Sequence, residues 1–186
     1  MDVEMTRRQF TTDEYLRMID AQIFDRDDRV ELVEGDVLDM APVGRSHALC
    51  VAVLNRRLVV GLGERGLVFP QMTLPLGARS AFEPDLTVLR PREAARRRAW
   101  ATPADVLLVV EASDTSLRRD RDIKLPIYAR AGIAEAWIVD VRGERILVYR
   151  SPRGGEYESV LEVARDGVVA PAAFPDLRVS VDEVFR

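Results

Sequence analysis

The sequence is poor in cysteine, histidine and lysine, and each shortage narrows what the protein can be. Its 186 residues include one cysteine, Cys50, and one histidine, His47. A single cysteine excludes a disulfide within the chain and a metal cluster held by cysteines. Because Cys50 lies in an apolar stretch with helical spacing, we expect a buried, inert thiol. Of the 27 lysine and arginine residues, only Lys124 is a lysine.

Long hydrophobic runs are also missing from the chain. No apolar stretch approaches the roughly 20 residues that a membrane-spanning helix needs. Residues 1–8 lack the apolar core of a secretion signal. We therefore expect a cytoplasmic protein that has no membrane partner.

The charge balance argues against one class of nucleic-acid-binding protein without excluding it. Hydrophobic residues make up 47% of the chain and charged residues 31%, as in ordinary globular proteins, and the length predicts a single domain over residues 1–186. The formal net charge is −4. This charge counts against a protein that coats nucleic acid non-specifically, because such binding neutralises phosphates with positive side chains. It leaves open a nuclease in which a local basic patch surrounds an acidic metal site.

The N-terminal part of the chain predicts a helix followed by a hairpin. Thr11 and Glu14 have the spacing of a capping box, which predicts a helix over residues 12–19. Apolar and polar residues then alternate over 30–33 and 37–40. Gly35 lies between these runs, as expected at the tight turn of a β-hairpin.

The rest of the chain alternates between helical and strand patterns. Helical spacing predicts a long helix over 46–63 and a second over 119–131, in which Pro126 either bends the helix or marks a later start. Strands are expected at 67–70, 72–76, 86–89, 106–111, 134–141, 146–149 and 160–163, followed by a short closing helix. This alternation predicts an α/β (α+β) protein in which a mixed central β-sheet is flanked by helices.

Two carboxylates lie at the ends of the most apolar strands. Asp85 directly precedes the run 86–89, and Glu111 directly follows the run 106–110. A carboxylate at the edge of a core is costly unless it is paired or binds a metal. Two carboxylates that face a common gap suit Mg²⁺ or Mn²⁺. The alternative is a pair of solvent-exposed charges at the strand ends.

Lys124 is expected to complete this site from the helix that follows. Asp120, Lys124 and Tyr128 are spaced four residues apart and therefore share one helical face. A lone lysine among arginines indicates a position where a compact ammonium is needed, unless it is there by drift. The alternative is an ordinary Asp120–Lys124 salt bridge on the helix surface. Tyr128 either bonds one of the carboxylates or belongs to the core, and Trp137 is expected to be packing.

The order Pro84-Asp85, Glu111, Lys124 resembles the signature of the PD-(D/E)xK nuclease superfamily, which has a restriction-endonuclease-like core. More narrowly, the chain resembles the Uma-type restriction endonuclease family. The segments that carry this resemblance are 30–36, 40–42 with His47, 83–85, 109–113 and 120–140. Together they span roughly residues 10–150. The common superfamily form has its lysine two residues after the glutamate, where this chain has Ser113, whereas the Uma-type pattern has the lysine on the following helix.

The resemblance implies roles for particular residues. Asp85 and Glu111 would bind the divalent ion, Mg²⁺ or Mn²⁺, and the carbonyl of Ala112 is a candidate third ligand. Lys124 would orient or help deprotonate the attacking water and stabilise the developing negative charge. Glu31 corresponds to an acidic residue often held near the metal, or else is a surface charge of the hairpin. His47 either contacts a phosphate or the water, or caps the long helix.

The function implied is that of a metal-dependent endonuclease that cleaves DNA, acting as a homodimer. Two alternatives stay open: a catalytically weak nuclease-fold protein with a binding or regulatory role, and a metal-dependent hydrolase of another phosphoester. A set of arginines near the proposed site either grips phosphates or forms a solvated surface. These are Arg90, Arg92, Arg96, Arg97, Arg98, Arg118, Arg119 and Arg121.

Overall fold

A computed structural model describes residues 7–25, 27–91 and 100–186 of the chain. Its α-helices are α1 (Thr12–Asp20), α2 (Arg45–Leu62), α3 (Leu117–Arg119), α4 (Leu125–Arg130) and α5 (Val181–Val184). The 3-10 helices are η1 (Gly63–Arg65) and η3 (Pro103–Asp105), and η4 (Asp120–Lys124) is a π-helix. The strands are β1 (Val30–Val33), β2 (Asp36–Asp39), β3 (Leu67–Pro70), β4 (Leu74–Pro75), β5 (Ala81–Phe82), β6 (Leu86–Leu89), β7 (Val106–Ser113), β8 (Glu135–Asp140), β9 (Arg145–Arg153), β10 (Glu156–Val163), β11 (Val168–Val169) and β12 (Val179–Ser180). None of the described helices is long and apolar enough to cross a membrane.

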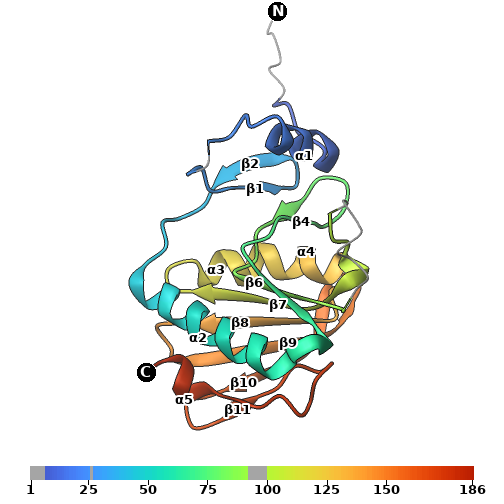
Figure 1. The fold of residues 1–186 in the computed structure, drawn as a ribbon. Coiled ribbons are helices and arrows are strands. Elements are labelled where there is room, and N and C mark those ends of the chain that lie inside the picture. Colours follow the sequence, from blue (N-terminus) through green and yellow to red (C-terminus); the bar gives the residue numbers. More distant parts are fainter. Residues whose placement is uncertain (1–6, 26, 92–99) are drawn as a thin grey trace, which may run out of the picture.

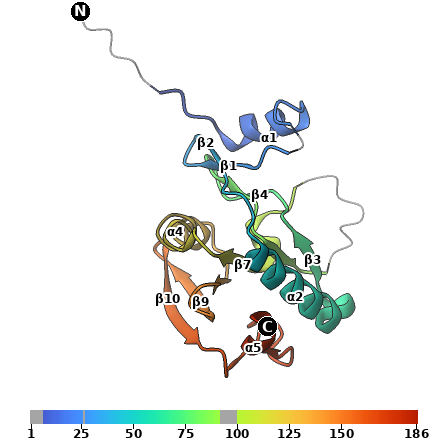
Figure 2. The ribbon, with the colours of Figure 1, turned by 90° about the vertical axis from the view of Figure 1, so that its left-hand side faces the viewer.

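The centre of the fold is a six-stranded mixed sheet in the order β10-β9-β8-β7-β6-β3 (Figure 1). β7 and β8 run parallel, and the other neighbouring pairs are antiparallel. Figure 2 shows α2 and α4 on opposite sides of β7. The expectation of a mixed central sheet flanked by helices is therefore confirmed.

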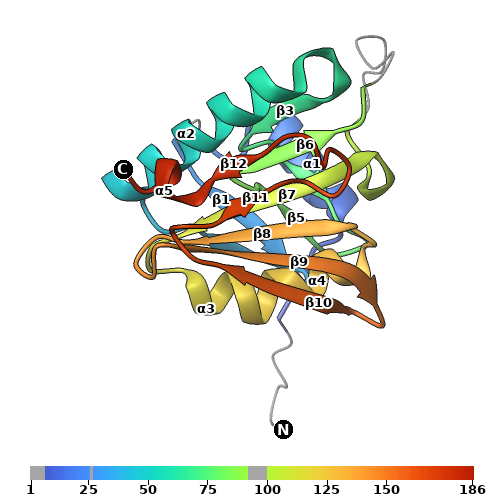
Figure 3. The same cartoon turned by 90° about the horizontal axis from the view of Figure 1, so that it is seen from below.

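Each face of the central sheet has its own hydrophobic core. On one face, α2 packs Leu54 and Leu58 against the sheet in a cluster that includes Val110. The C-terminal elements β12 and α5 belong to the same cluster and lie beside α2 (Figure 3). On the other face, α4 packs against a cluster that includes Val109. Because successive strand residues point to opposite faces, Glu111 shares the α4 face with Val109.

A second, smaller sheet has the order β2-β1-β5-β4 and is covered by α1. The predicted capping box of Thr11 and Glu14 is present at the start of α1. The predicted hairpin is β1 and β2, and its turn residues Glu34 and Gly35 have φ values of 49° and 98°. β5, which the sequence pattern did not predict, bonds this hairpin to the rest of the fold through the pairing of Leu32 with Ala81.

The helix predicted over 119–131 is interrupted by a π-turn. The backbone N–H of Leu125 donates to the carbonyl of Asp120, five residues earlier, and α4 then begins with a proline in its first turn. Pro126 has no N–H to bond to the preceding turn, so the start of a new helical segment suits it. This matches the expected later start at Pro126.

Several expectations for strands and connectors need correction or fall outside the described residues. The strand expected over 72–76 is shorter, because only β4 pairs. β9 and β10 are longer than expected and form a hairpin at the edge of the central sheet. Cys50 is buried, as expected. Arg92, Arg96, Arg97 and Arg98 lie outside the described residues.

Candidate active site

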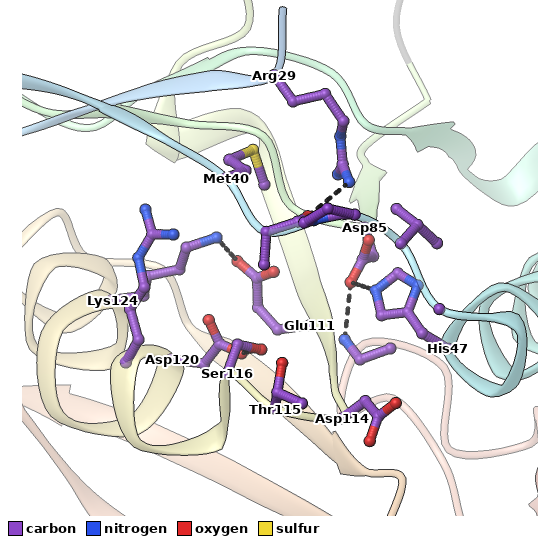
Figure 4. Close-up of a pocket in the computed structure, with 16 residues that line it drawn as sticks. Arg29, Met40, His47, Asp85, Glu111, Asp114, Thr115, Ser116, Asp120 and Lys124 are labelled. Atoms are coloured by element: carbon purple, nitrogen blue, oxygen red, sulfur yellow. Dashed lines mark hydrogen bonds and ion pairs between the residues drawn. The ribbon is translucent and has the colours of Figure 1, made fainter.

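A cavity of about 260 Å³ opens where the N-terminal end of β6 lies beside the C-terminal end of β7. Figure 4 shows side chains from several elements pointing into it. The segment that joins β2 to α2 forms one wall, and η4 forms another. Its lining residues are Arg29, Met40, Ala41, Pro42, Val43, Gly44, His47, Asp85, Glu111, Ala112, Asp114, Thr115, Ser116, Arg119, Asp120 and Lys124.

Asp85 is held at this cavity by two hydrogen bonds to one of its oxygens. His47, in the first turn of α2, lies with Nε2 2.9 Å from Asp85 Oδ2. The backbone N–H of Ala112 donates to the same oxygen at 2.8 Å. Oδ1 makes no hydrogen bond with another described residue. Asp85 therefore presents one fixed oxygen and one open oxygen.

Lys124 and Tyr128 both reach Glu111 from the segment that contains η4 and α4. Lys124 Nζ donates to Glu111 Oε1 at 3.0 Å, and the hydroxyl of Tyr128 donates to the same oxygen. Tyr128 also packs its ring edge-on against Phe82, with centroids 5.5 Å apart. Among the described residues, none bonds Glu111 Oε2. The prediction that Tyr128 bonds a carboxylate is confirmed, and so is its place in the core.

Glu31 contacts the same ammonium of Lys124 and is fully buried. It accepts hydrogen bonds from Lys124 Nζ at 2.8 Å and from Arg119 Nη2 at 3.0 Å. The backbone N–H of Glu83 donates to it as well. Glu31 is thus not a surface charge of the hairpin. The hairpin delivers a buried carboxylate that fixes Lys124 and Arg119.

Asp120 takes different partners from those expected. The hydroxyls of Ser113 and Ser116 both donate to Asp120 Oδ2, at 2.7 Å and 2.6 Å. The ion pairs of Lys124 are with Glu31 and Glu111, so the alternative of an Asp120–Lys124 salt bridge is wrong. Ser113, in the place where the superfamily has its lysine, anchors Asp120 instead.

The burial of these charges shifts their pKa values. Burial raises the pKa of Glu111 to about 8, with Lys124 opposing the shift and the carboxylates of Asp120 and Asp85 adding to it. Burial alone would lower the pKa of Lys124, but Glu111 and Glu31 outweigh it and raise that pKa above its ordinary value. Lys124 is therefore an ammonium.

The residues present fit a divalent cation bound by few protein ligands. Four carboxylates are buried here, those of Glu31, Asp85, Glu111 and Asp120, against the single buried ammonium of Lys124. Across the described residues, no three His, Cys, Asp or Glu side chains are arranged to hold a metal ion. Mg²⁺ commonly uses one or two carboxylates together with waters and substrate phosphates. The open oxygens of Asp85 and Glu111 meet that requirement.

The arginines predicted to surround the site separate into distinct groups. Arg119 lines the cavity, and Arg29, which the sequence did not single out, lines it too. Arg121 pairs with Asp122, and Arg90 bonds the carbonyl of Ala104. The wall formed by residues 40–44 was also not predicted as part of the cavity, although 40–42 carried the family resemblance.

Comparisons with known proteins bear on the family and the fold. The sequence pattern of the Uma2 family, described as "Putative restriction endonuclease", matches residues 12–182. A crystal structure of "a putative nuclease belonging to DUF820" from Anabaena variabilis ATCC 29413 has a TM-score of 0.75 to this chain, covers 95% of it and 97% of its own chain, and shares 16% sequence identity. No curated protein matches the chain. The fold is restriction-endonuclease-like, and the chain belongs to the Uma2 family.

Proposed function

We propose that this protein is a divalent-metal-dependent endonuclease that hydrolyses phosphodiester bonds in DNA. The family and the fold indicate a restriction-endonuclease-like nuclease. The observation that carries the finer proposal is the meeting of Asp85, Glu111 and Lys124 in one cavity. They come from the residue before β6, from β7 and from η4, so the tertiary fold alone brings them together.

The cation is proposed to be Mg²⁺ or Mn²⁺, held by Asp85, Glu111 and the carbonyl of Ala112. These are hard oxygen ligands of the kind that both ions prefer. When bound, the cation would offset negative charge on the phosphate and make water more acidic. His47 keeps Asp85 oriented through its 2.9 Å contact, and Tyr128 does the same for Glu111. Such supporting bonds tune how tightly carboxylates hold a metal.

Lys124 is proposed to stabilise the negative charge that develops on the phosphate. Its ammonium is fixed in advance by Glu31 and Glu111, so it needs no reorganisation when a phosphate arrives. Arg119 and Arg29, which also line the cavity, can contact phosphates on either side of the scissile bond. A homodimer would place two such cavities against the two strands of a duplex, and a cytoplasmic location would give access to DNA; both belong to this proposal.

The test is cleavage of plasmid and single-stranded DNA with Mg²⁺ or Mn²⁺. Wild type is compared with Asp85→Asn, Lys124→Met and Asp122→Asn, the last a matched control because Asp122 is exposed on η4. We expect at least a 100-fold loss for the first two variants and little change for the control. Cleavage unaffected by either Asp85→Asn or Lys124→Met would refute the proposed site.

A second candidate is a catalytically weak nuclease-fold protein that binds nucleic acid. The observation that favours it is that Glu111 Oε1 is already engaged by Lys124 and Tyr128. Binding of DNA with metal, without cleavage of DNA or RNA, would support this reading against the nuclease. Hydrolysis of a small phosphodiester, without cleavage of either polymer, would instead support a phosphoesterase.

A further inference from the structure

Hydrolysis by water requires a group that takes a proton from the attacking water. Lys124 is not suited to this role in the structure. Its ammonium donates to Glu31 at 2.8 Å and to Glu111 at 3.0 Å, and Nζ lies 5.4 Å from the centroid of the Phe82 ring. An ammonium has only donors and no lone pair with which to accept a proton. A side chain that acts as proton acceptor must therefore be another residue of the cavity.

Asp120 has the geometry that this role requires. It is 4% exposed and lines the cavity, and Figure 4 places its carboxylate below Glu111 and beside Ser116. The two serine hydroxyls both donate to Oδ2, at 2.7 Å and 2.6 Å. Oδ1 makes no hydrogen bond with another residue in the described part of the chain. One oxygen is thus anchored while the other is open to accept a proton.

The other acceptors that line the cavity are less suited to take the proton. Asp85 and Glu111 are assigned to the cation in the proposed function. His47 uses Nε2 on Asp85, and its Nδ1 is buried without a hydrogen-bond partner. Asp114 pairs with Arg142 at 2.8 Å. Asp114 keeps a second oxygen, but its side chain is one-third exposed and paired with a cation, whereas Asp120 is buried and forms no ion pair with a described residue.

We propose that Asp120 is a catalytic residue that accepts the proton of the attacking water, a role that rests on the proposed nuclease function. The water oxygen forms a bond to phosphorus as the bond from phosphorus to the leaving oxygen breaks. One proton of the water passes to Asp120 Oδ1, and the leaving oxygen takes a proton from solvent water. The products are a phosphate monoester and an alcohol, and Asp120 then returns its proton to solvent.

The proton acceptor and the positive charge come from the two ends of the π-turn. Asp120 begins η4 and Lys124 ends it, and both side chains line the cavity. π-turns within helices are often found at functional sites. Ser113 replaces the lysine of the common motif with a hydroxyl that fixes the proton acceptor. Lys124 then supplies the positive charge from the helix.

The first test compares Asp120→Asn with Asp122→Asn in the DNA cleavage assay. The asparagine carbonyl can still accept from Ser113 and Ser116, so the fold is kept while the proton acceptor is lost. General-base catalysis contributes on the order of 100- to 10,000-fold. We therefore expect cleavage by Asp120→Asn to fall at least 100-fold, and cleavage by Asp122→Asn to stay near wild type.

The second test measures Mn²⁺ binding by calorimetry in the absence of nucleic acid. A proton acceptor that is not a metal ligand should leave the Mn²⁺ affinity of Asp120→Asn within about threefold of wild type. Asp85→Asn should bind Mn²⁺ much more weakly in the same experiment. A loss of affinity in Asp120→Asn as large as that in Asp85→Asn would make Asp120 a metal ligand and overturn the proposal.

The third test asks whether a small carboxylate replaces the missing one. Asp120→Ala leaves space beside the two serine hydroxyls, so added formate should raise its cleavage rate at least tenfold, and should not raise that of Asp85→Ala. Cleavage by Asp120→Asn within tenfold of wild type, while Asp85→Asn is inactive, would overturn the role of Asp120 alone. An inactive wild type would overturn the nuclease proposal and this inference with it.

Discussion

The ammonium of Lys124 lies 2.8 Å from a carboxylate oxygen of Glu31, a residue 93 positions earlier in the chain. The same ammonium lies 3.0 Å from Glu111. Glu31 belongs to the small N-terminal sheet, whereas Glu111 belongs to the central sheet. Lys124 therefore ties the two sheets together through buried charge, in addition to its proposed role in chemistry.

Lys124→Met should destabilise the fold strongly. Removing one partner of a buried ion pair leaves the other charge unpaired, at a cost of about 3–5 kcal/mol. Two buried carboxylates, those of Glu31 and Glu111, lose their ammonium in this variant. Urea unfolding at neutral pH should therefore show a loss of several kcal/mol.

A double-mutant cycle separates the Glu31–Lys124 ion pair from the packing that is lost with the Lys124 side chain. Glu31→Gln removes one of the two carboxylate charges that lose their ammonium in Lys124→Met, so the double variant should be more stable than the two single losses predict. Residues in contact typically couple by about 0.5–3 kcal/mol. Additivity of the two substitutions would mean that the pair contributes nothing to folding.

His47→Ala should weaken metal binding without touching the proposed ligands. Nε2 of His47 holds Asp85 Oδ2 at 2.9 Å, and loss of such a supporting bond typically lowers metal affinity about 10- to 100-fold. Calorimetric titration with Mn²⁺ measures the change. Leu49→Ala is the control, since Leu49 is exposed on the same helix. Unchanged Mn²⁺ affinity in His47→Ala would show that its contact with Asp85 does not contribute to metal binding.

Most helices and strands could be predicted from the sequence because interactions between residues close together in the chain determine them. The capping box at Thr11 and Glu14 and the turn at Gly35 act over three or four residues. The runs 86–89 and 106–110 are buried strands because every side chain in them except that of Thr87 is apolar. β5 escaped prediction because two residues carry no periodicity and pair only once the hairpin is in place.

Only some residues of the candidate site could be predicted from the sequence. Asp85 and Glu111 stood out because each adjoins an apolar run, and Lys124 because it is the one lysine. The partners of these residues depend on tertiary structure. An Asp120–Lys124 pair on a helix surface is worth only about 0.3–0.5 kcal/mol. The buried glutamates outcompete it for Lys124, and the serine hydroxyls take Asp120.

Alkaline pH should destabilise the protein through its tyrosines. The chain has four, and burial is the first cause of a raised pKa in each: Tyr15, Tyr128, Tyr149 and Tyr157. A raised pKa in the folded state favours the neutral phenol, so the stabilisation is complete below the unfolded value of about 10 and is lost as pH rises through the folded values. The free energy of unfolding should therefore fall above about pH 10.

Absorbance of tyrosinate as a function of pH measures this effect. In concentrated urea the tyrosines should titrate near pH 10, and in the folded protein only at higher pH. Circular dichroism recorded on the same samples shows whether the fold persists. Full ionisation near pH 10 with an intact circular dichroism spectrum would contradict the expected burial of the phenols.

Glu135→Gln should destabilise the packing of the C-terminal segment, residues 164–178, while leaving the cavity intact. Glu135 is 1% exposed and accepts from Trp137 Nε1 at 2.7 Å, from Arg150 Nη2 at 2.8 Å and from the backbone N–H of Ala172. The neutral amide cannot form the ion pair with Arg150, so we expect a loss of about 2–4 kcal/mol in urea unfolding. Cleavage by protease within residues 164–178 should also become faster.

The control for this variant is Glu158→Gln, whose exposed pair with Arg153 should contribute no more than about 1 kcal/mol. Glu135 begins β8, and because β8 runs parallel to β7, it lies at the opposite end of these strands from the cavity residue Ala112. Mn²⁺ affinity should therefore stay at the wild-type value in both variants. Loss of Mn²⁺ binding in Glu135→Gln would show that the C-terminal segment and the cavity are coupled across the sheet.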